Sequence, residues 1–409
     1  MCNDRTAMLS AIAVVSLAAW AYLAGFRGRF WRSGPVLRAQ TPSGHAKVAA
    51  VVPARDEAEH IARSIGSLVE QDYAGEFAMV LVDDNSSDGT AEIARQTAES
   101  LGGGERLAVV RGQPLPEGWS GKLWAIHQGL AHQAALTADF VLLTDADIEH
   151  ARGHLALLVA KSERDELDLV SEMVRLHCET PAERALIPAF VFFFQMLYPF
   201  ASVANPQKRT AGAAGGTMLV RRAALDRVEG VSRIRSHLID DCALAREIKR
   251  TGGRIWLGHA EDTVSLRVYG WCDAWNMIAR TAYAQLGYSP LMLAGCVAGI
   301  GVVYCAPPLV ILFGRGKTRW IGALAWGTMA ASFQPTLKRY KRSPLWGLAL
   351  PAIGLFYLGA TVASAWRHSA GHGGRWKARV YGETGTEGQG IEGLGIREQS
   401  CETISFKPY

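Results

Sequence analysis

The sequence has few charged residues and lacks the cysteine patterns of disulfide-stapled and zinc-binding proteins. Only 20% of its 409 residues are charged and 49% are hydrophobic, which is apolar for a soluble protein. The seven cysteines form no Cys-x-x-Cys pair and no cluster with histidine, so neither a disulfide framework nor a zinc site is predicted. The net charge of +5 is not gathered in a stripe of basic and aromatic residues, which argues against nucleic acid as a partner.

An uncharged segment near the N-terminus is long enough to cross a bilayer. Residues 7–26 carry no charge, and about twenty such residues span the hydrocarbon core as a helix. No clear small-residue cleavage site is present, so a membrane anchor is predicted over residues 1–28. Basic residues accumulate on the cytoplasmic side of membrane segments, so we expect the chain beyond the anchor to face the cytoplasm. The basic residues that follow the segment are Arg27, Arg29, Arg32 and Arg38.

Three further apolar stretches predict several C-terminal membrane helices within residues 289–368. They lie at about 290–313, 319–334 and 345–366. The middle stretch is short enough to be re-entrant or interfacial. Basic residues flank it on both sides, so the number and orientation of the spans stay open. The final segment, 382–409, is rich in Gly and Glu with little apolar content, which predicts a disordered tail.

Between the apolar ends, strand-like and helix-like patterns alternate. Short apolar runs at 47–52, 78–82 and 140–144 read as strands, and the first is followed by a break at Pro53. The next segment places apolar residues at helical spacing. This alternation predicts an α/β domain with βαβ units and a mostly parallel sheet. The apolar positions of that helix are Ile61, Ile65, Leu68 and Val69.

Asp145 and Asp147 follow directly behind the apolar run 140–144. A charge-free run rich in Val and Leu predicts a buried strand, and ligands of open α/β sheets bind at the carboxyl ends of strands. Mg²⁺ and Mn²⁺ take carboxylate ligands and usually keep a substrate phosphate in their shell. The two residues therefore predict a metal-diphosphate site, with an ordinary solvated loop as the alternative.

Further acidic and small residues follow other elements. Asp84 is the second residue after the apolar run 78–82, and its alternative role is turn formation. Asp240 and Asp241 open a predicted helix, a place that capping and the helix dipole favour by themselves. The functional interpretation is a general base, a carboxylate that removes a proton from an attacking hydroxyl. The glycine turn 215–217 permits close approach of a ligand, or is an ordinary tight turn.

Six motifs in order resemble family 2 glycosyltransferases with the GT-A fold. The resemblance covers roughly residues 47–285 and implies a Rossmann-like nucleotide-sugar domain over 45–285. The anchor, the membrane C-terminus and the stretches 116–122 and 277–281 are similar to hopene-associated glycosyltransferases of bacterial hopanoid gene clusters. This closer resemblance implies a bacterial inner membrane location. The motifs are Pro-Ala-Arg-Asp-Glu at Pro53, Val-Asp-Asp-Asn-Ser-Ser-Asp-Gly-Thr at Val82, Gly-Lys-x-x-Ala at Gly121, Asp-Ala-Asp at Asp145, Gly-Gly-Thr at Gly215 and Asp-Asp-x-x-Leu at Asp240.

The resemblance also implies a role for each motif on the donor side. Asp84 would hydrogen-bond the uracil ring of a UDP-sugar, Lys122 would approach the diphosphate, and Asp145 would contact the ribose or sugar. Asp147 would hold a divalent metal, Mg²⁺ or Mn²⁺. The residues that would line the nucleotide pocket beside Asp84 are Pro53, Arg55 and Glu57.

On the acceptor side, the resemblance makes Asp241 the catalytic base with Asp240 in support. Arg280 lies where many membrane relatives carry a Gln-x-x-Arg-Trp motif, but Met277 and Thr281 replace its Gln and Trp. That motif is tied to processive synthesis, so its loss argues against a processive polysaccharide synthase. The residues implied to border the acceptor site are Gly215, Gly216, Thr217 and Arg280.

Together these features predict an inverting glycosyltransferase that moves a sugar to a lipid acceptor, with a hopanoid as the candidate. One displacement assisted by a base inverts the anomeric centre. The uncharged aromatic stretch 185–204, which contains Pro188 and Pro199, is predicted to dip into the bilayer surface and present the lipid. A buried core helix is the alternative for this stretch. The alternative functions are a polyprenyl-phosphate sugar transferase, a processive polysaccharide synthase and a non-enzymatic membrane scaffold, and protein partners are unknown.

Overall fold

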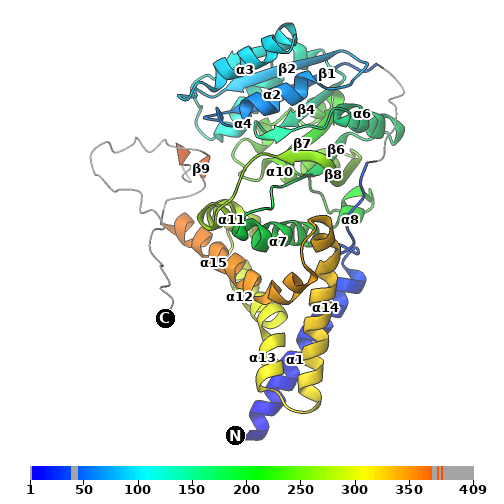
Figure 1. Cartoon of the computed structure of the whole chain (residues 1–409), viewed down its shortest axis with the longest axis vertical. Coiled ribbons are helices and arrows are strands. Elements are labelled where there is room, and N and C mark those ends of the chain that lie inside the picture. The colour runs from blue at the N-terminus through cyan, green and yellow to red at the C-terminus, as the bar shows by residue number, and fades with distance from the viewer. Residues whose placement is uncertain (1, 38–44, 371–374, 377–378, 381–409) are drawn as a thin grey trace, which may run out of the picture.

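The computed structural model describes residues 2–37, 45–370, 375–376 and 379–380. The predictions made for Arg38 and for the tail 382–409 lie outside these residues. An α/β domain with a large sheet rests on a group of long helices, and α7 (Pro181–Leu197) and α11 (Trp271–Gln285) lie between the two (Figure 1).

Eight strands of the described chain form a sheet in the order β3-β2-β1-β4-β7-β6-β8-β5. Only β7 and β5 run antiparallel to their neighbours, which confirms the mostly parallel sheet. A separate two-stranded sheet joins β9 (Arg375–Trp376) to β10 (Arg379–Val380). The strands of the large sheet are β1 (Val48–Ala54), β2 (Phe77–Asp83), β3 (Leu107–Arg111), β4 (Phe140–Thr144), β5 (Ile148–Glu149), β6 (Leu169–Arg175), β7 (Thr217–Arg221) and β8 (Ile255–Ser265).

Pro53 lies inside β1, so the predicted break at this residue is wrong. It pairs with Val82 of β2, and the strand continues to Ala54. On the other side of β1, the pairing with β4 ends before Pro53, at Val51 and Leu143. Pro53 therefore has a hydrogen-bonded neighbour strand on one side only, where a residue without an N–H is tolerated as it is on an edge strand.

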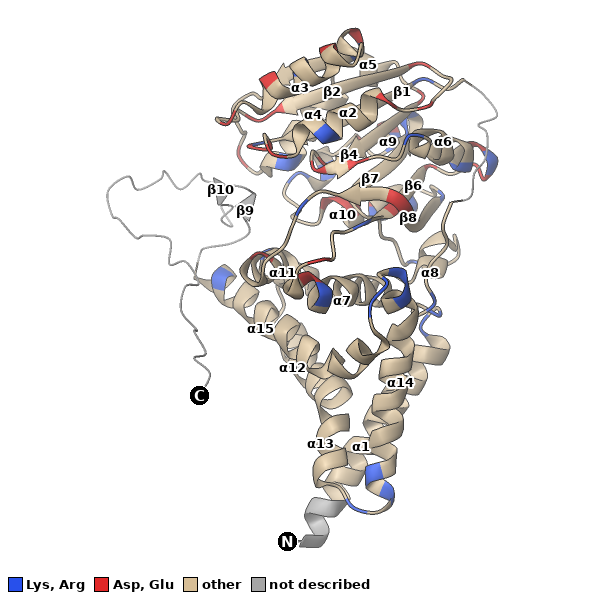
Figure 2. Cartoon of the chain, in the orientation of Figure 1, with Lys and Arg blue, Asp and Glu red and all other residues tan. Residues whose placement is uncertain are grey.

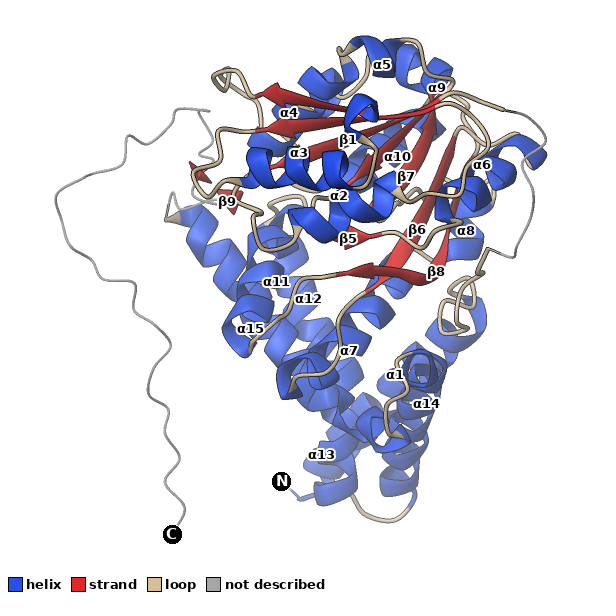
Figure 3. Ribbon diagram, turned by 45° about the horizontal axis from the view of Figure 1, so that its top comes forward, coloured by secondary structure: helices blue, strands red, loops and turns tan. Residues whose placement is uncertain are grey.

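Helices cover both faces of the sheet (Figure 3). The apolar positions predicted for the first helix are all buried, on α2, in the core of one face. The other face is covered by the helices that carry Lys122 and Asp241. On the first face lie α2 (Ile61–Val69), α3 (Thr90–Ser100) and α6 (His154–Arg164), and on the second α4 (Gly121–Leu130), α5 (Gln133–Leu136), α9 (Arg222–Arg227), α10 (Asp240–Arg250) and α8 (Phe200–Ala204).

Gly129 allows α4 to pack directly on the sheet. A Cβ atom here would lie 2.4 Å from Cγ1 of Val51 and 3.2 Å from Cγ2 of Val82. We expect Gly129→Ala to lower the free energy of unfolding by about 1–3 kcal/mol, since the core must shift, as measured by unfolding in detergent. Gly66→Ala on α2 is the control, because its Cβ would meet Leu101 at an ordinary 3.4 Å. Equal stability of the two variants would contradict this packing argument.

The helices below the domain are apolar, and Figure 2 shows them almost free of acidic and basic residues except near their ends. The described chain contains four segments long and apolar enough to cross a membrane: Ala7–Phe26, Pro181–Ala204, Pro290–Phe313 and Pro344–Ser369. These segments comprise α1 (Cys2–Phe26), α7 with α8, α12 (Pro290–Ile300) continued by a π-helical turn (Gly301–Cys305) and α13 (Ala306–Phe313), and a 3₁₀ turn (Pro344–Ala349) with α15 (Leu350–Ser369). The bundle also contains α14 (Lys317–Arg339), which is not one of the four.

The helix that contains the middle C-terminal stretch, 319–334, is longer than the stretch itself. It lies within α14, a helix of 23 residues that packs along α1 and α13. The helix extends past the apolar stretch at both ends because Lys and Arg are good helix formers. The turn between α13 and α14 lies at the end of the bundle far from the sheet (Figure 1). The two basic clusters that flank this stretch therefore lie at opposite ends of α14, and its position relative to a membrane remains a prediction.

The stretch 185–204 forms most of α7 and all of α8. A capping box of Thr180 and Glu183 starts α7, which continues through Pro188. Two thirds of the segment is buried against the protein, and α7 lies across the bundle rather than along it (Figure 1). Its contact with a bilayer surface remains a prediction.

Candidate active site

A cavity of about 1140 Å³ opens at the carboxyl ends of β1 and β4. It extends from the sheet to α11 and to the C-terminal end of α15, where Tyr283, Trp366 and His368 line it. Seven of the residues singled out in the sequence line this one space. They are Pro53, Glu57, Lys122, Asp145, Asp147, Asp240 and Arg280.

Lys122 lies between two of the predicted carboxylates. Ser120 caps α4, and Lys122 in the first turn of that helix reaches Asp145 Oδ1 at 2.8 Å and Asp240 Oδ2 at 3.1 Å. Burial alone would lower the pKa of Lys122, but the charges of Asp145 and Asp240 outweigh it and raise the pKa above its usual range. A permanent cation therefore joins the end of β4 to the start of α10.

Asp241 is held by two backbone N–H groups beside this lysine. Its Oδ2 accepts from the Gly215 N–H at 2.9 Å and its Oδ1 from the Cys242 N–H at 2.6 Å. Burial, together with the neighbouring charge of Asp240, raises the pKa of Asp241 to about 7, although Lys122 opposes the shift. A carboxylate with this pKa is able to accept a proton near neutral pH.

Asp147 is bound by an arginine that the sequence did not single out. Its Oδ2 accepts from Arg267 Nε at 3.1 Å, and Nη2 of the same guanidinium donates to Glu57 Oε1 at 3.0 Å. Ser265 lies 3.3 Å from the same oxygen. Arg267 follows β8 in a segment with no motif, so the sequence offered no signal for it.

The carboxylates at the end of β4 fit a metal that shares its shell with a diphosphate. Among the described residues, no group of three or more His, Cys, Asp and Glu side chains could hold a metal alone. Mg²⁺ in nucleotide sites needs only one or two carboxylates, because phosphate oxygens and waters complete its shell. Asp147, with Asp145 two residues earlier, provides that donor set inside the cavity.

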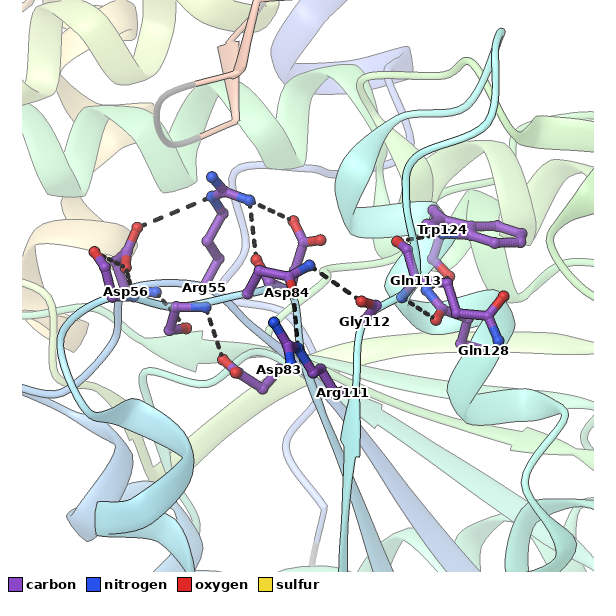
Figure 4. A network of polar contacts seen from close by, with 12 residues as sticks. Arg55, Asp56, Asp83, Asp84, Arg111, Gly112, Gln113, Trp124 and Gln128 are labelled. Atoms are coloured by element: carbon purple, nitrogen blue, oxygen red, sulfur yellow. Dashed lines mark hydrogen bonds and ion pairs between the residues drawn. The ribbon is translucent and has the colours of Figure 1, made fainter.

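Asp84 lies at a different place, in the network of Figure 4. It is 1% exposed, and Arg55 donates to its Oδ2 at 3.1 Å and to its carbonyl oxygen at 2.9 Å. A Cβ on Gly112 would lie 3.3 Å from Asp84 Oδ1. Nearby, Trp124 Nε1 donates to the carbonyl oxygen of Gln113. Arg55 and Asp84 do not line the large cavity. The sequence did not single out Gly112 or Trp124 as neighbours of Asp84.

The glycine turn reaches the site only in part. Gly215 contacts Asp241, and a Cβ there would lie 3.4 Å from Asp241 Oδ2. Thr217 is fully buried, and its hydroxyl lies 3.3 Å from His154 Nε2. The structure therefore brings Gly215 to Asp241 and keeps the Thr217 side chain away from the cavity. Arg280 is exposed and lines the cavity from α11.

Comparison with known proteins gives a match that covers the part of this site from Pro53 to Gly216. Residues 49–229 match the family described as Glycosyl transferase family 2. The 4,4'-diaponeurosporenoate glycosyltransferase of Staphylococcus haemolyticus is 22% identical over 223 residues, which make up 54% of this chain and 56% of that relative. The match thus spans about half the length of this curated relative.

A solved structure shares the fold over most of the chain. Mannosyltransferase PcManGT from Pyrobaculum calidifontis, in complex with GDP-Man and Mn²⁺, superposes with a TM-score of 0.58 at 22% identity. The superposition covers 88% of this chain and 99% of that one. It confirms the expected GT-A-like fold.

Proposed function

We propose that this chain, whose residues 49–229 match Glycosyl transferase family 2, moves a sugar from a nucleotide-sugar to a membrane lipid with inversion. One observation carries the proposal: Lys122 joins Asp145, at the end of β4, to Asp240, at the start of α10, beside Asp241, whose pKa is raised to about 7. This arrangement suits a reaction that must activate an acceptor hydroxyl and neutralise a leaving diphosphate.

On the donor side, we assign the developing charge of the diphosphate to a divalent metal and to Lys122. Asp147 would hold Mg²⁺ or Mn²⁺, which supplies Lewis-acid stabilisation of the leaving group when bound. The complex of PcManGT with GDP-Man and Mn²⁺ supports this cofactor class. Asp145 would face the ribose or sugar. UDP-sugars are the first donors to test because of the resemblance at Asp84, although that side chain is buried against Arg55 outside the large cavity.

On the acceptor side, the cavity continues to helices of the apolar bundle. Two exposed aromatic residues, Tyr288 and Trp366, line its α11 and α15 end, as is typical of side chains at a membrane interface. A lipid headgroup at this level would enter the cavity that Asp240, the neighbour of Asp241, lines. We propose a lipid with a free hydroxyl, a hopanoid first, at the cytoplasmic face of a bacterial inner membrane.

The test is nucleotide release by detergent-purified protein across a panel of nucleotide-sugars and lipids. We expect release to require one nucleotide-sugar, a divalent cation and a hydroxylated lipid such as a hopanoid. Polyprenyl phosphate serves as the competing acceptor and lipid-free detergent as the blank. Release that depends only on polyprenyl phosphate would contradict the hydroxyl acceptor, and no release with any donor would contradict the proposed activity.

A further inference from the structure

The turn before β7 holds the proposed base through a backbone N–H. Gly215 donates to Asp241 at 2.9 Å. On one side of the turn, the Ser171 hydroxyl of β6 accepts from the Ala214 N–H at 2.9 Å and donates to the Ala214 carbonyl oxygen at 3.1 Å. Ser171 is fully buried, so both bonds lie away from water. The position of Gly215 is therefore set from β6 as well as from the turn itself.

On the other side, the Thr144 hydroxyl at the end of β4 donates to the carbonyl oxygen of Gly216 at 2.8 Å. This hydroxyl has one proton, so in its 2.9 Å contact with His150 Nε2 the ring must donate. His150 is thus the neutral tautomer protonated at Nε2, and burial, with His154 nearby, holds its pKa well below the usual range. A directed chain of donors runs from His150 through Thr144 to the turn.

We propose that Thr144 is a positioning residue for glycosyl transfer, because its hydroxyl fixes the turn that aims the Gly215 N–H at Asp241. The inference rests on the proposed role of Asp241 as base. Thr144 is 2% exposed and does not line the cavity, so it acts through the turn rather than on a substrate. Thr144 directly precedes Asp145 in the chain. The end of β4 therefore positions Asp145 on the donor side and, through the Thr144 hydroxyl, the turn beside Asp241.

Two effects are expected of Thr144→Val, which keeps the side-chain shape and removes the hydroxyl. A displaced turn misplaces Asp241, and kcat should fall about 10- to 100-fold, while the KM for the nucleotide-sugar stays within about threefold. The Gly215 N–H stabilises the charged form of Asp241, so its loss should move the acidic limb of kcat/KM to higher pH by about half to one unit.

Thr144→Val leaves the other titratable groups that face Asp241 unchanged. They are Asp240, Lys122, Cys242 and Tyr198. A shift of the pH profile of the variant would therefore come from loss of the hydrogen bond between the Gly215 N–H and Asp241. Thr144→Ser restores the hydroxyl and should restore kcat to within about threefold of wild type. Thr263→Val is the structural control, because that buried hydroxyl accepts from the Ala151 N–H at 3.2 Å and does not touch the turn. It should keep the wild-type kcat and pH profile.

A wild-type kcat and pH profile in Thr144→Val would overturn the inference, as would an equal loss of kcat in Thr263→Val. If Thr144→Val does not fold, Ser171→Ala removes a single oxygen from the other side of the turn and is judged by the same two assays. Full activity in Asp241→Asn would instead overturn the proposed function. An inactive Asp241→Asn beside an unaffected Thr144→Val overturns the positioning role alone.

Discussion

Asp241→Asn is expected to lower kcat by about 10²–10⁴-fold and to leave the Kd for the nucleotide-sugar within about threefold of wild type. The amide oxygen of Asn can still accept from the Gly215 N–H, which keeps the turn in place, while the bond from the Cys242 N–H is lost because the amide nitrogen is a donor. The amide cannot take a proton from an acceptor hydroxyl, which isolates the role of the base. Nucleotide release gives kcat, and titration calorimetry gives Kd.

The dependence of kcat/KM on pH is a second test of the role of Asp241. Burial and Asp240 raise the pKa of Asp241 to about 7, so its charged fraction grows as pH rises through that value. The kcat/KM of the wild type should therefore rise up to about pH 7 and level off above it, and the residual activity of the Asn variant should lack this limb.

Asp226→Asn is the matched control for Asp241→Asn. Asp226 is an exposed carboxylate on α9 that pairs with Arg222, so its loss should leave kcat unchanged. A wild-type rate in Asp241→Asn would contradict the role of base, and it would favour an acceptor phosphate, which is nucleophilic without deprotonation.

The strand ends that form the site could be predicted because local patterns determine them. The apolar run before Asp145 and the acidic start of the helix at Asp240 each identify one element. A parallel sheet then gathers the loops at the carboxyl ends of its strands at one edge. This reasoning is sufficient to place Asp145 at the edge of the sheet where the cavity opens. Lys122 was implied only by the resemblance to family 2 glycosyltransferases, and the position of Asp240 beside it depends on the path of the chain after β7.

Long-range contacts and side-chain directions could not be predicted in the same way. Arg267 lies 120 residues from Asp147 and 210 from Glu57, and only the path of the chain after β8 brings the three together. Thr217 could point to either face of the sheet. The register that pairs it with Thr144 places its hydroxyl against His154, away from the acceptor side.

Asp147→Asn is expected to weaken Mn²⁺-dependent binding of the nucleotide-sugar by about 10²–10³-fold, since a metal ligand at a diphosphate is worth several kcal/mol. A neutral amide is a poorer ligand for a hard cation than a carboxylate. The measurement is titration calorimetry of the donor with and without Mn²⁺. Glu149→Gln, two residues along the chain and paired with Arg63 at the surface, is the control and should bind as the wild type does.

The metal-free titration decides what Asp147 does, because Arg267 is a second cation at the same oxygen. If Asp147 holds the metal, Mn²⁺ should strengthen donor binding by the wild type but not by the variant. Without metal, the variant should bind the donor at least as well, since Arg267 loses one of its two carboxylate partners and can turn to the diphosphate. An equal response of both proteins to Mn²⁺ would contradict the assignment and leave Arg267 and Lys122 as the cations that offset the leaving diphosphate.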